Sequence, residues 1–277
     1  MITQDNPYTL SNPFRTRILS GDVCAVMSTK LVLKNEMAML MKMANIHGAF
    51  IDMEHSTNDL HTVAQFVLAC TYCGVSPIVR APNKAPENLA RILDAGAAAV
   101  VIPHVDSLAE IKALVRAAKY APLGDRGCTN NQPILNFQKV PTFKQNELLN
   151  RETMLIPMIE TPAAVELVDE YLAVDGVDGI LIGSNDLCTD MGIPGQYDSP
   201  VYQDAVVKII AAGKKAGKPI GIGGIGPRLD LLEKFFTMGA SWSLSGADMA
   251  MLQAGMQKLG STYEELNGRV KEAREKM

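Results

Sequence analysis

The sequence lacks the features of nucleic-acid-binding, membrane and exported proteins. Its 26 Lys and Arg residues are outnumbered by 30 Asp and Glu residues, and no block of basic residues could follow a phosphate backbone. The longest apolar run, around residues 95–103, is far shorter than a bilayer span, and residues 1–22 carry no signal pattern. We therefore expect a cytoplasmic protein that has neither nucleic acid nor membrane as a partner.

Cysteines are few, odd in number and scattered, so a disulfide framework is not expected. There are five, and only Cys70 and Cys73 form a C-x-x-C pair. That pair falls at the end of a helical pattern, whereas a redox pair needs a helix start to lower a thiol pKa. Without a second pair it cannot complete a zinc site. We interpret both residues as thiols of the protein core.

Short apolar runs alternate with amphipathic segments along the whole chain, which is typical of repeated βα units. The predicted strands cover residues 23–27, 49–52, 77–80, 99–102, 155–159, 179–182, 219–222 and 242–244. The predicted helices cover residues 36–43, 59–70, 86–94, 108–119, 163–171, 202–216, 229–238 and 249–258. Eight units in 277 residues, 47% of them hydrophobic, predict a single-domain α/β protein, a (β/α)8 TIM barrel.

We divide the chain into an N-terminal extension, residues 1–20, and a barrel with a C-terminal helix, residues 21–277. One connection is unusually long, because residues 120–154 separate the fourth predicted helix from the fifth strand. The segment is rich in Pro and Gly and has little periodicity. Such inserts in compact domains often serve a function, so we expect a lid over the site or a subunit contact.

Catalytic groups of a barrel cluster at the C-terminal ends of its strands. Strand four contributes only His104 there, and strand eight only Ser245 and Asp248. Lys218 precedes strand seven, and no lysine is expected at a strand's C-terminal end, which argues against a Schiff base. The other candidates are Asp52, Glu54 and His55 after strand two, Arg80 after strand three, Glu160 after strand five, and Asn185 and Asp186 after strand six.

Glu160 and Asp186 follow neighbouring strands and are the oxygen ligands that a hard divalent cation prefers. Asp186 could instead cap the short segment that follows it. Arg80 either forms an ion pair with a nearby acid or binds an anionic substrate group. His55 is either structural or a proton-transfer group.

The glycine-rich stretch of residues 221–226 matches G-x-G-x-x-G after a strand. Its position late in the chain is wrong for a dinucleotide-binding unit. It could bind a phosphate, as loops after strands seven and eight of barrels often do. We favour the simpler interpretation that these glycines allow the backbone to crowd the barrel mouth.

Five stretches in register are similar to the HpcH/HpaI family of class II pyruvate aldolases. They are FIDMEHSTND, PIVRAPNKAPENLARILDAGAAAVVIPHV, YAPLGDRG, PMIETPAAVE and VDGVDGILIGSNDLCTDMG. The resemblance covers residues 20–250 and implies a carbon-carbon lyase that cleaves a 4-hydroxy-2-oxo acid to pyruvate and an aldehyde through a metal-bound pyruvate enolate. It also implies a divalent cofactor (Mg²⁺, Mn²⁺ or Co²⁺) and a hexamer with an exchanged C-terminal helix.

The resemblance also assigns roles to individual residues. It implies that Glu160 and Asp186 bind the metal, and that backbone amides of Gly183, Ser184, Asn185 and Asp186 bind the pyruvate carboxylate. Arg80 corresponds to the substrate-binding Arg and His55 to the catalytic His. The supporting acids are Asp52, Glu54 and, from a neighbouring subunit, Asp94.

The sequence departs from the family pattern at three places. Ser184 and Asn185 replace Pro-Ala, Met158 replaces Gln, and Met27 with Ser28 replaces an aromatic residue. These positions line the expected pocket, so the acceptor aldehyde is left open. The alternatives are an oxaloacetate decarboxylase or acyl-CoA lyase on the same barrel, or a non-catalytic barrel that binds a metabolite.

Overall fold

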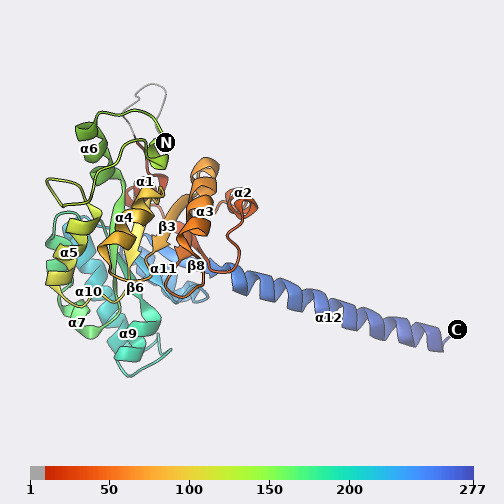
Figure 1. Cartoon of the computed structure of the whole chain (residues 1–277). Coiled ribbons are helices and arrows are strands. Elements are labelled where there is room, and N and C mark those ends of the chain that lie inside the picture. Colours follow the sequence, from red (N-terminus) through yellow and green to blue (C-terminus); the bar gives the residue numbers. More distant parts are fainter. Residues whose placement is uncertain (1–9) are drawn as a thin grey trace.

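Eight parallel strands close into a barrel in the computed structural model, which describes residues 10–277 (Figure 1). Each strand pairs with the next, and the first pairs with the last. The strands are β1 (Cys24–Thr29), β2 (Gly48–Asp52), β3 (Ser76–Arg80), β4 (Ala99–Ile102), β5 (Met154–Ile159), β6 (Ile180–Gly183), β7 (Ile220–Gly223) and β8 (Trp242–Ala247). The predicted (β/α)8 architecture is confirmed, and every predicted strand coincides with an observed one to within three residues.

Helices cover the outside of the barrel. They are α2 (Asn35–Met43), α3 (Leu60–Cys73), α4 (Pro86–Asp94), α5 (Leu108–Ala118), α7 (Pro162–Glu166), α8 (Val168–Ala173), α10 (Pro200–Ala216) and α11 (Leu229–Met238). The short helix α9 (Ser184–Asp190) lies at the end of the barrel where the strands end. The helix predicted at residues 163–171 is in fact two helices that meet at Leu167. Cys70 and Cys73 lie in the last turn of α3 as free thiols, as the sequence predicts.

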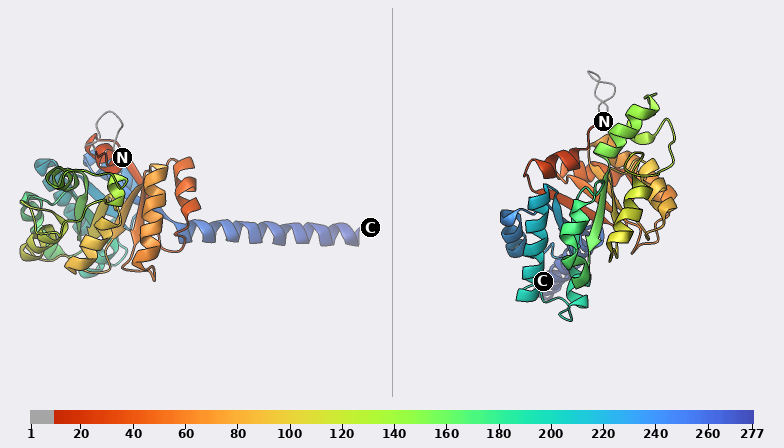
Figure 2. Two further views of the ribbon diagram at one scale, coloured as in Figure 1. Left: turned by 45° about the horizontal axis from the view of Figure 1, so that its top comes forward. Right: turned by 90° about the vertical axis from the view of Figure 1, so that its left-hand side faces the viewer.

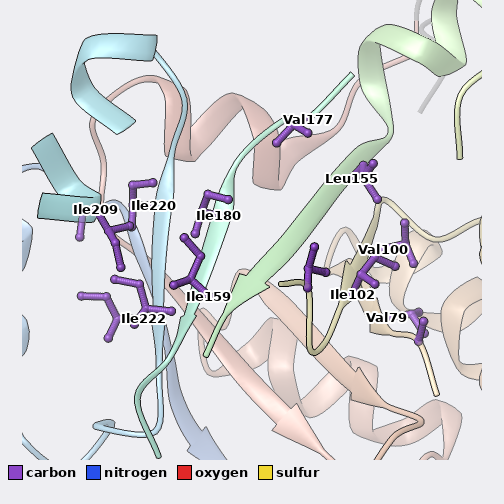
Figure 3. Packing of buried hydrophobic residues seen from close by; sticks show 14 of the residues in the cluster. Val79, Val100, Ile102, Leu155, Ile159, Val177, Ile180, Ile209, Ile220 and Ile222 are labelled. Carbon is purple, nitrogen blue, oxygen red and sulfur yellow. The ribbon is translucent and has the colours of Figure 1, made fainter. Parts of the chain in front are cut away.

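The core has two layers because successive strand residues point to opposite sides. On β4, Val100 and Ile102 pack outward against the helices, whereas Ala99 and Val101 fill the barrel interior. Figure 3 shows the outer layer, in which side chains from several strands lie between sheet and helices. Strands such as β4 are therefore buried on both faces, which explains why they appear as continuous apolar runs in the sequence.

A short helix, α1 (Pro13–Leu19), closes the end of the barrel where the strands begin. Its Phe14 is fully buried and meets Trp242 edge to face, with ring centroids 5.2 Å apart. The backbone N–H of Phe14 donates to Ser76 Oγ at 3.0 Å, at the first residue of β3. Part of the predicted N-terminal extension therefore belongs to the barrel packing, and residues 1–9 lie outside the described residues.

The long segment between α5 and β5 lies at that same end. It contains the 3-10 turn η1 (Pro133–Leu135) and a helix that the sequence analysis missed, α6 (Thr142–Glu152). Leu148 and Leu149 of α6 pack with Leu10, Tyr120 and others in a small cluster of their own. Figure 1 shows α6 and α9 at opposite ends of the barrel. The segment joins the end of a helix to the start of a strand, so it cannot be a lid over the mouth of its own barrel.

The last helix, α12 (Asp248–Glu275), is much longer than predicted and projects far from the barrel (Figures 1 and 2). Asp248 is its one buried residue. Within the described part of the chain, no helix has the length and apolarity required to cross a membrane.

Candidate active site

A cavity of about 280 Å³ opens at the C-terminal ends of the strands. Seven of the predicted site residues line it: Asp52, His55, Arg80, Gly183, Ser184, Asn185 and Asp186. Strand alternation explains part of this set. On β2, Phe50 and Asp52 point inward, and on β3, Ile78 and Arg80 do the same, so the last inward residue of each strand meets the cavity.

Arg80 and Asp52 form a buried bidentate ion pair. Arg80 Nε lies 2.9 Å from Asp52 Oδ1, and Nη2 lies 2.7 Å from Oδ2. Burial acts to raise the pKa of the Asp52 carboxyl, but hydrogen bonds from Arg80 and Lys30 outweigh it and hold the pKa well below its usual range. The interpretation of Arg80 as an ion-pair partner of neighbouring acids is thus confirmed, and its guanidinium lies in the cavity wall.

Glu54 connects three basic side chains at the edge of the cavity. Its Oε2 is 2.7 Å from Arg80 Nη1 and 3.6 Å from His55 Nε2. Its Oε1 is 2.7 Å from Nε2 of His104, the residue that the sequence analysis named only as the contribution of strand four. His55 itself is exposed beside Glu54, a position from which its imidazole can exchange a proton with a ligand in the cavity.

His104 also contacts the predicted metal ligand Glu160. The backbone N–H of His104 donates to Glu160 Oε2 at 2.7 Å, and the residue has a positive φ of 55°. Such a conformation is costly for a residue with a side chain and is tolerated where surrounding contacts enforce it. The sequence could have indicated this contact, because His104 follows β4 and Glu160 follows β5, the strand that pairs with β4.

Glu160 and Asp186 fit a divalent cation. Glu160 is buried, and its Oε1 has no hydrogen-bond partner among the described residues. Burial, together with the charges of Asp186 and Glu54, raises the pKa of the Glu160 carboxyl. Residues 10–277 hold no cluster of three or more metal-binding side chains, so a metal here would take two carboxylates and complete its shell with water or substrate.

The backbone of β6 passes so close to Glu160 that position 183 has no room for a side chain. A Cβ atom at Gly183 would lie 2.6 Å from Glu160 Cγ, closer than side chains approach each other. Gly183 is the N-cap residue of α9, and Asp186 lies in the first turn of that helix. The alternative interpretation of Asp186 as a helix cap is therefore wrong. The Asp186 carboxylate is exposed on the cavity side of the mouth.

Ser184 and Asn185 direct their side chains to tyrosines. Ser184 Oγ accepts a hydrogen bond from Tyr202 Oη at 2.8 Å, and Asn185 Oδ1 accepts one from Tyr197 Oη at 2.5 Å. Their side-chain oxygens are therefore engaged within the protein. Both residues also line the cavity, so these contacts hold part of its wall in place.

Asp94 does not join the other predicted residues. It ends α4 and pairs with buried Arg126, whose Nη2 is 2.5 Å from Asp94 Oδ1. A helix of a (β/α)8 barrel ends where the strands begin, so Asp94 lies at the end opposite the mouth of its own barrel. Its assigned role requires a neighbouring copy of the chain.

Lys30 overturns the expectation that no lysine follows a strand. It comes directly after β1, lines the cavity, and places Nζ 3.0 Å from Asp52 Oδ2. The alternation of β1 could have found it, because Cys24 and Val26 face the barrel interior and Lys30 shares their parity. Lys218, in contrast, precedes β7 as predicted and donates to Leu172 O at 2.6 Å.

The glycines of residues 221–226 serve close packing. A Cβ atom at Gly221 would lie 2.1 Å from the Trp242 ring, and Gly224 has a φ of +88° beside Asn185. The closed barrel excludes a dinucleotide-binding sheet. Gly221 lies at the closed end of the barrel, beside Trp242, whereas Gly223 and Gly224 line the cavity. Only these later glycines support the interpretation that the backbone crowds the mouth.

Comparison with known proteins agrees with this architecture. Residues 32–253 match the HpcH/HpaI aldolase/citrate lyase family, and the chain belongs to that family. Similar proteins include a 4-hydroxy-4-methyl-2-oxoglutarate aldolase of Chaetomium globosum, 33% identical over 77% of this chain and 80% of its own. A 5-keto-4-deoxy-D-glucarate aldolase of Salmonella arizonae is 31% identical over 81% of this chain and 86% of its own. The solved HpcH/HpaI aldolase of Desulfitobacterium hafniense superposes with a TM-score of 0.85 at 28% identity, covering 93% of this chain and 98% of its own.

Proposed function

We propose that the chain is a metal-dependent pyruvate aldolase, which cleaves a 4-hydroxy-2-oxo acid to pyruvate and an aldehyde or condenses the two. The observation that carries this proposal is the meeting of Glu160 and Asp186 with Arg80 and His55 at one barrel mouth. Relatives that bear aldolase names over most of their length support the reaction class.

Glu160 and Asp186 would hold the metal, with the partnerless Glu160 Oε1 as the buried ligand atom. A bound Mg²⁺, Mn²⁺ or Co²⁺ supplies Lewis acidity for the electrons released when the carbon-carbon bond breaks. Backbone amides of residues 183–186 bind the carboxylate of the 2-oxo acid. The tyrosine contacts of Ser184 and Asn185 keep that main chain fixed.

His55 accepts the proton of the 4-hydroxyl group, directly or through a water molecule. The C3–C4 bond then breaks, the C4–O bond becomes the carbonyl of the aldehyde, and the electron pair of the broken bond passes to C3 as an enolate. Arg80 balances the negative charge that develops on this enolate. Asp52 and Glu54 position Arg80 and His55 through the ion pairs described above, and Asp94 of a neighbouring copy supports them. Protonation of C3 releases pyruvate.

A second copy of the chain would cover α12. The helix exposes an apolar stripe, which we call the α12 stripe: Leu252, Met256, Leu259, Tyr263, Leu266 and Val270. Its alternating spacing of four and three residues is that of helices that pack along one another. We propose a homo-oligomer, a hexamer by resemblance, in which the stripe packs on a neighbouring barrel and the insert of residues 120–154 contributes a further contact.

We treat residues 21–277, α12 included, as one domain, and residues 1–20 as an extension whose helix α1 packs on the barrel. A cytoplasmic location fits the five free cysteines.

The proposal is tested by incubating the protein with Mn²⁺ and a panel of 4-hydroxy-2-oxo acids, and following pyruvate with a coupled dehydrogenase. Release of pyruvate and aldehyde in equal amounts is expected for at least one member of the panel. Absence of cleavage across the panel, and of condensation between pyruvate and a matching set of aldehydes, would refute it.

A further inference from the structure

Lys30 stands in the cavity as a cation that the proposed mechanism does not use. It precedes residues 32–253, the span matched by the family, so the match carries no role to this position. Ser28 and Lys30, two residues apart at the end of β1, both line the cavity.

The backbone around Lys30 is fixed from two sides. Asp248, buried at the start of α12, accepts hydrogen bonds from Leu31 N and Val32 N at 2.8 Å each, and from Lys30 N at 3.2 Å. The carbonyl oxygen of Lys30 accepts a hydrogen bond from Asn58 Nδ2 at 3.1 Å. A lysine held in this way is a preorganised part of the site and not a loose surface side chain.

The ammonium group of Lys30 has capacity for another anion. The Lys30 ammonium group has three N–H donors, and the ion pair with Asp52 Oδ2 occupies one of them. Arg80 binds the same carboxylate oxygen. One third of the Lys30 side chain is exposed, whereas the side chain of Asp52 is fully buried. The ammonium therefore lies between the buried carboxylate and the open cavity.

The cavity reaches from residues 183–186 after β6 to Lys30 after β1. With the 2-oxo acid end at residues 183–186 and the 4-hydroxyl group at His55, as proposed above, the substituent beyond C4 can reach the β1 side of the cavity. His55 follows β2, the strand that pairs with β1. We propose that Lys30 is a specificity-determining residue that binds a second carboxylate, carried by the aldehyde-derived half of the substrate.

The inference rests on the proposed function and narrows it to one substrate class, the 4-hydroxy-2-oxo diacids. A Lys ammonium is suited to this task because it is a compact charge on a flexible stem, able to follow a carboxylate at the open end of the cavity. Loss of a hydrogen bond to a charged group weakens binding by a free energy that corresponds to a decrease of about 10- to 100-fold in kcat/KM.

The test compares 4-hydroxy-2-oxoglutarate with 4-hydroxy-2-oxopentanoate, in which a methyl group replaces the second carboxylate. Wild type, Lys30→Met and Lys30→Arg are assayed with saturating Mn²⁺. Lys34→Met is the matched control, because Lys34 lies four residues further on and is exposed outside the cavity. Wild type is expected to prefer the diacid by about 10-fold or more in kcat/KM.

Lys30→Met is expected to lose about 10- to 100-fold on the diacid and less than about 3-fold on the monoacid, mainly through KM. Lys30→Arg should keep the preference, and Lys34→Met should match wild type. Equal cleavage of both compounds by wild type overturns the inference and leaves the aldolase proposal intact. An equal loss on both compounds in Lys30→Met, or pyruvate trapped on Lys30 by borohydride, also overturns it. Failure of wild type to cleave any 4-hydroxy-2-oxo acid removes both proposals.

Discussion

Replacing Arg80 with Met tests the ion-pair cluster at the mouth through stability alone. The substitution removes both hydrogen bonds from the guanidinium to the fully buried Asp52 carboxylate, and the ion pair with Glu54. Removing one partner of a buried pair typically costs about 3–5 kcal/mol, because a charge is left without compensation. Lys30 and two backbone N–H groups remain on Asp52, so we expect about 3 kcal/mol.

Each kcal/mol shifts the melting temperature of a somewhat smaller protein by about 2–4 °C, so the melting temperature should fall by about 6–12 °C. The decisive assay repeats the substitution in an Asp52→Asn background, where the buried charge no longer exists. There Arg80→Met should cost about 1 kcal/mol or less. Arg116→Met is the control, because the Arg116–Asp125 pair is exposed and such pairs contribute about 0–1 kcal/mol. The same loss in both backgrounds would refute the argument that Asp52 is a buried charge compensated by Arg80.

Three further predictions concern the base, acid stability and assembly. His55→Ala should slow aldol cleavage by about 10²- to 10⁴-fold but decarboxylation of oxaloacetate much less, since only cleavage removes a hydroxyl proton; an equal loss in both, with Mn²⁺ still bound, would exclude His55 as the base. The lowered pKa of Asp52 means that its stabilising effect is present above the ordinary carboxyl pKa and is lost as pH falls through the folded-state value. The difference in unfolding free energy between wild type and Asp52→Asn should therefore begin to narrow below about pH 4 and continue to narrow as pH falls further, and a difference that stays constant below pH 4 would contradict this linkage. Leu259→Glu with Leu266→Glu should lower the mass measured by light scattering without altering the melting of the barrel, and an unchanged mass would show that the α12 stripe is not an interface.

The sequence predicts most of the fold because hydrophobic periodicity reports burial directly. Strands such as β4 are buried on both faces and stand out as apolar runs, and the positions of all eight strands follow from this pattern. α6 was missed because its sequence, TFKQNELLNRE, buries few residues and lies within a stretch punctuated by Pro and Gly. The predicted last helix ended at residue 258, whereas the apolar spacing of the α12 stripe continues to Val270 and could have extended it.

The part of the site that could be predicted consists of residues at or just after the ends of the predicted strands. Asp52, His55, Arg80, Asn185 and Asp186 were found because polar residues that follow apolar strands meet at one mouth. Gly183 and Ser184 were named only through the family resemblance. Lys30 was missed because the predicted first strand ended at residue 27, three residues before the lysine. The contacts of His104 with Glu54 and Glu160 depend on its positive φ and on how the side chains are placed in space. The sequence pattern predicts neither of these.

The most direct test of the account is the dependence of pyruvate release on a divalent metal and on Glu160. The protein is assayed with a cleavable 4-hydroxy-2-oxo acid in excess chelator and after return of Mn²⁺, alongside Glu160→Gln and with direct measurement of bound Mn²⁺ by calorimetry. We expect the chelator to abolish release and Mn²⁺ to restore it in wild type, while Glu160→Gln remains folded, binds Mn²⁺ weakly and stays inactive. Undiminished pyruvate release in excess chelator would contradict the account.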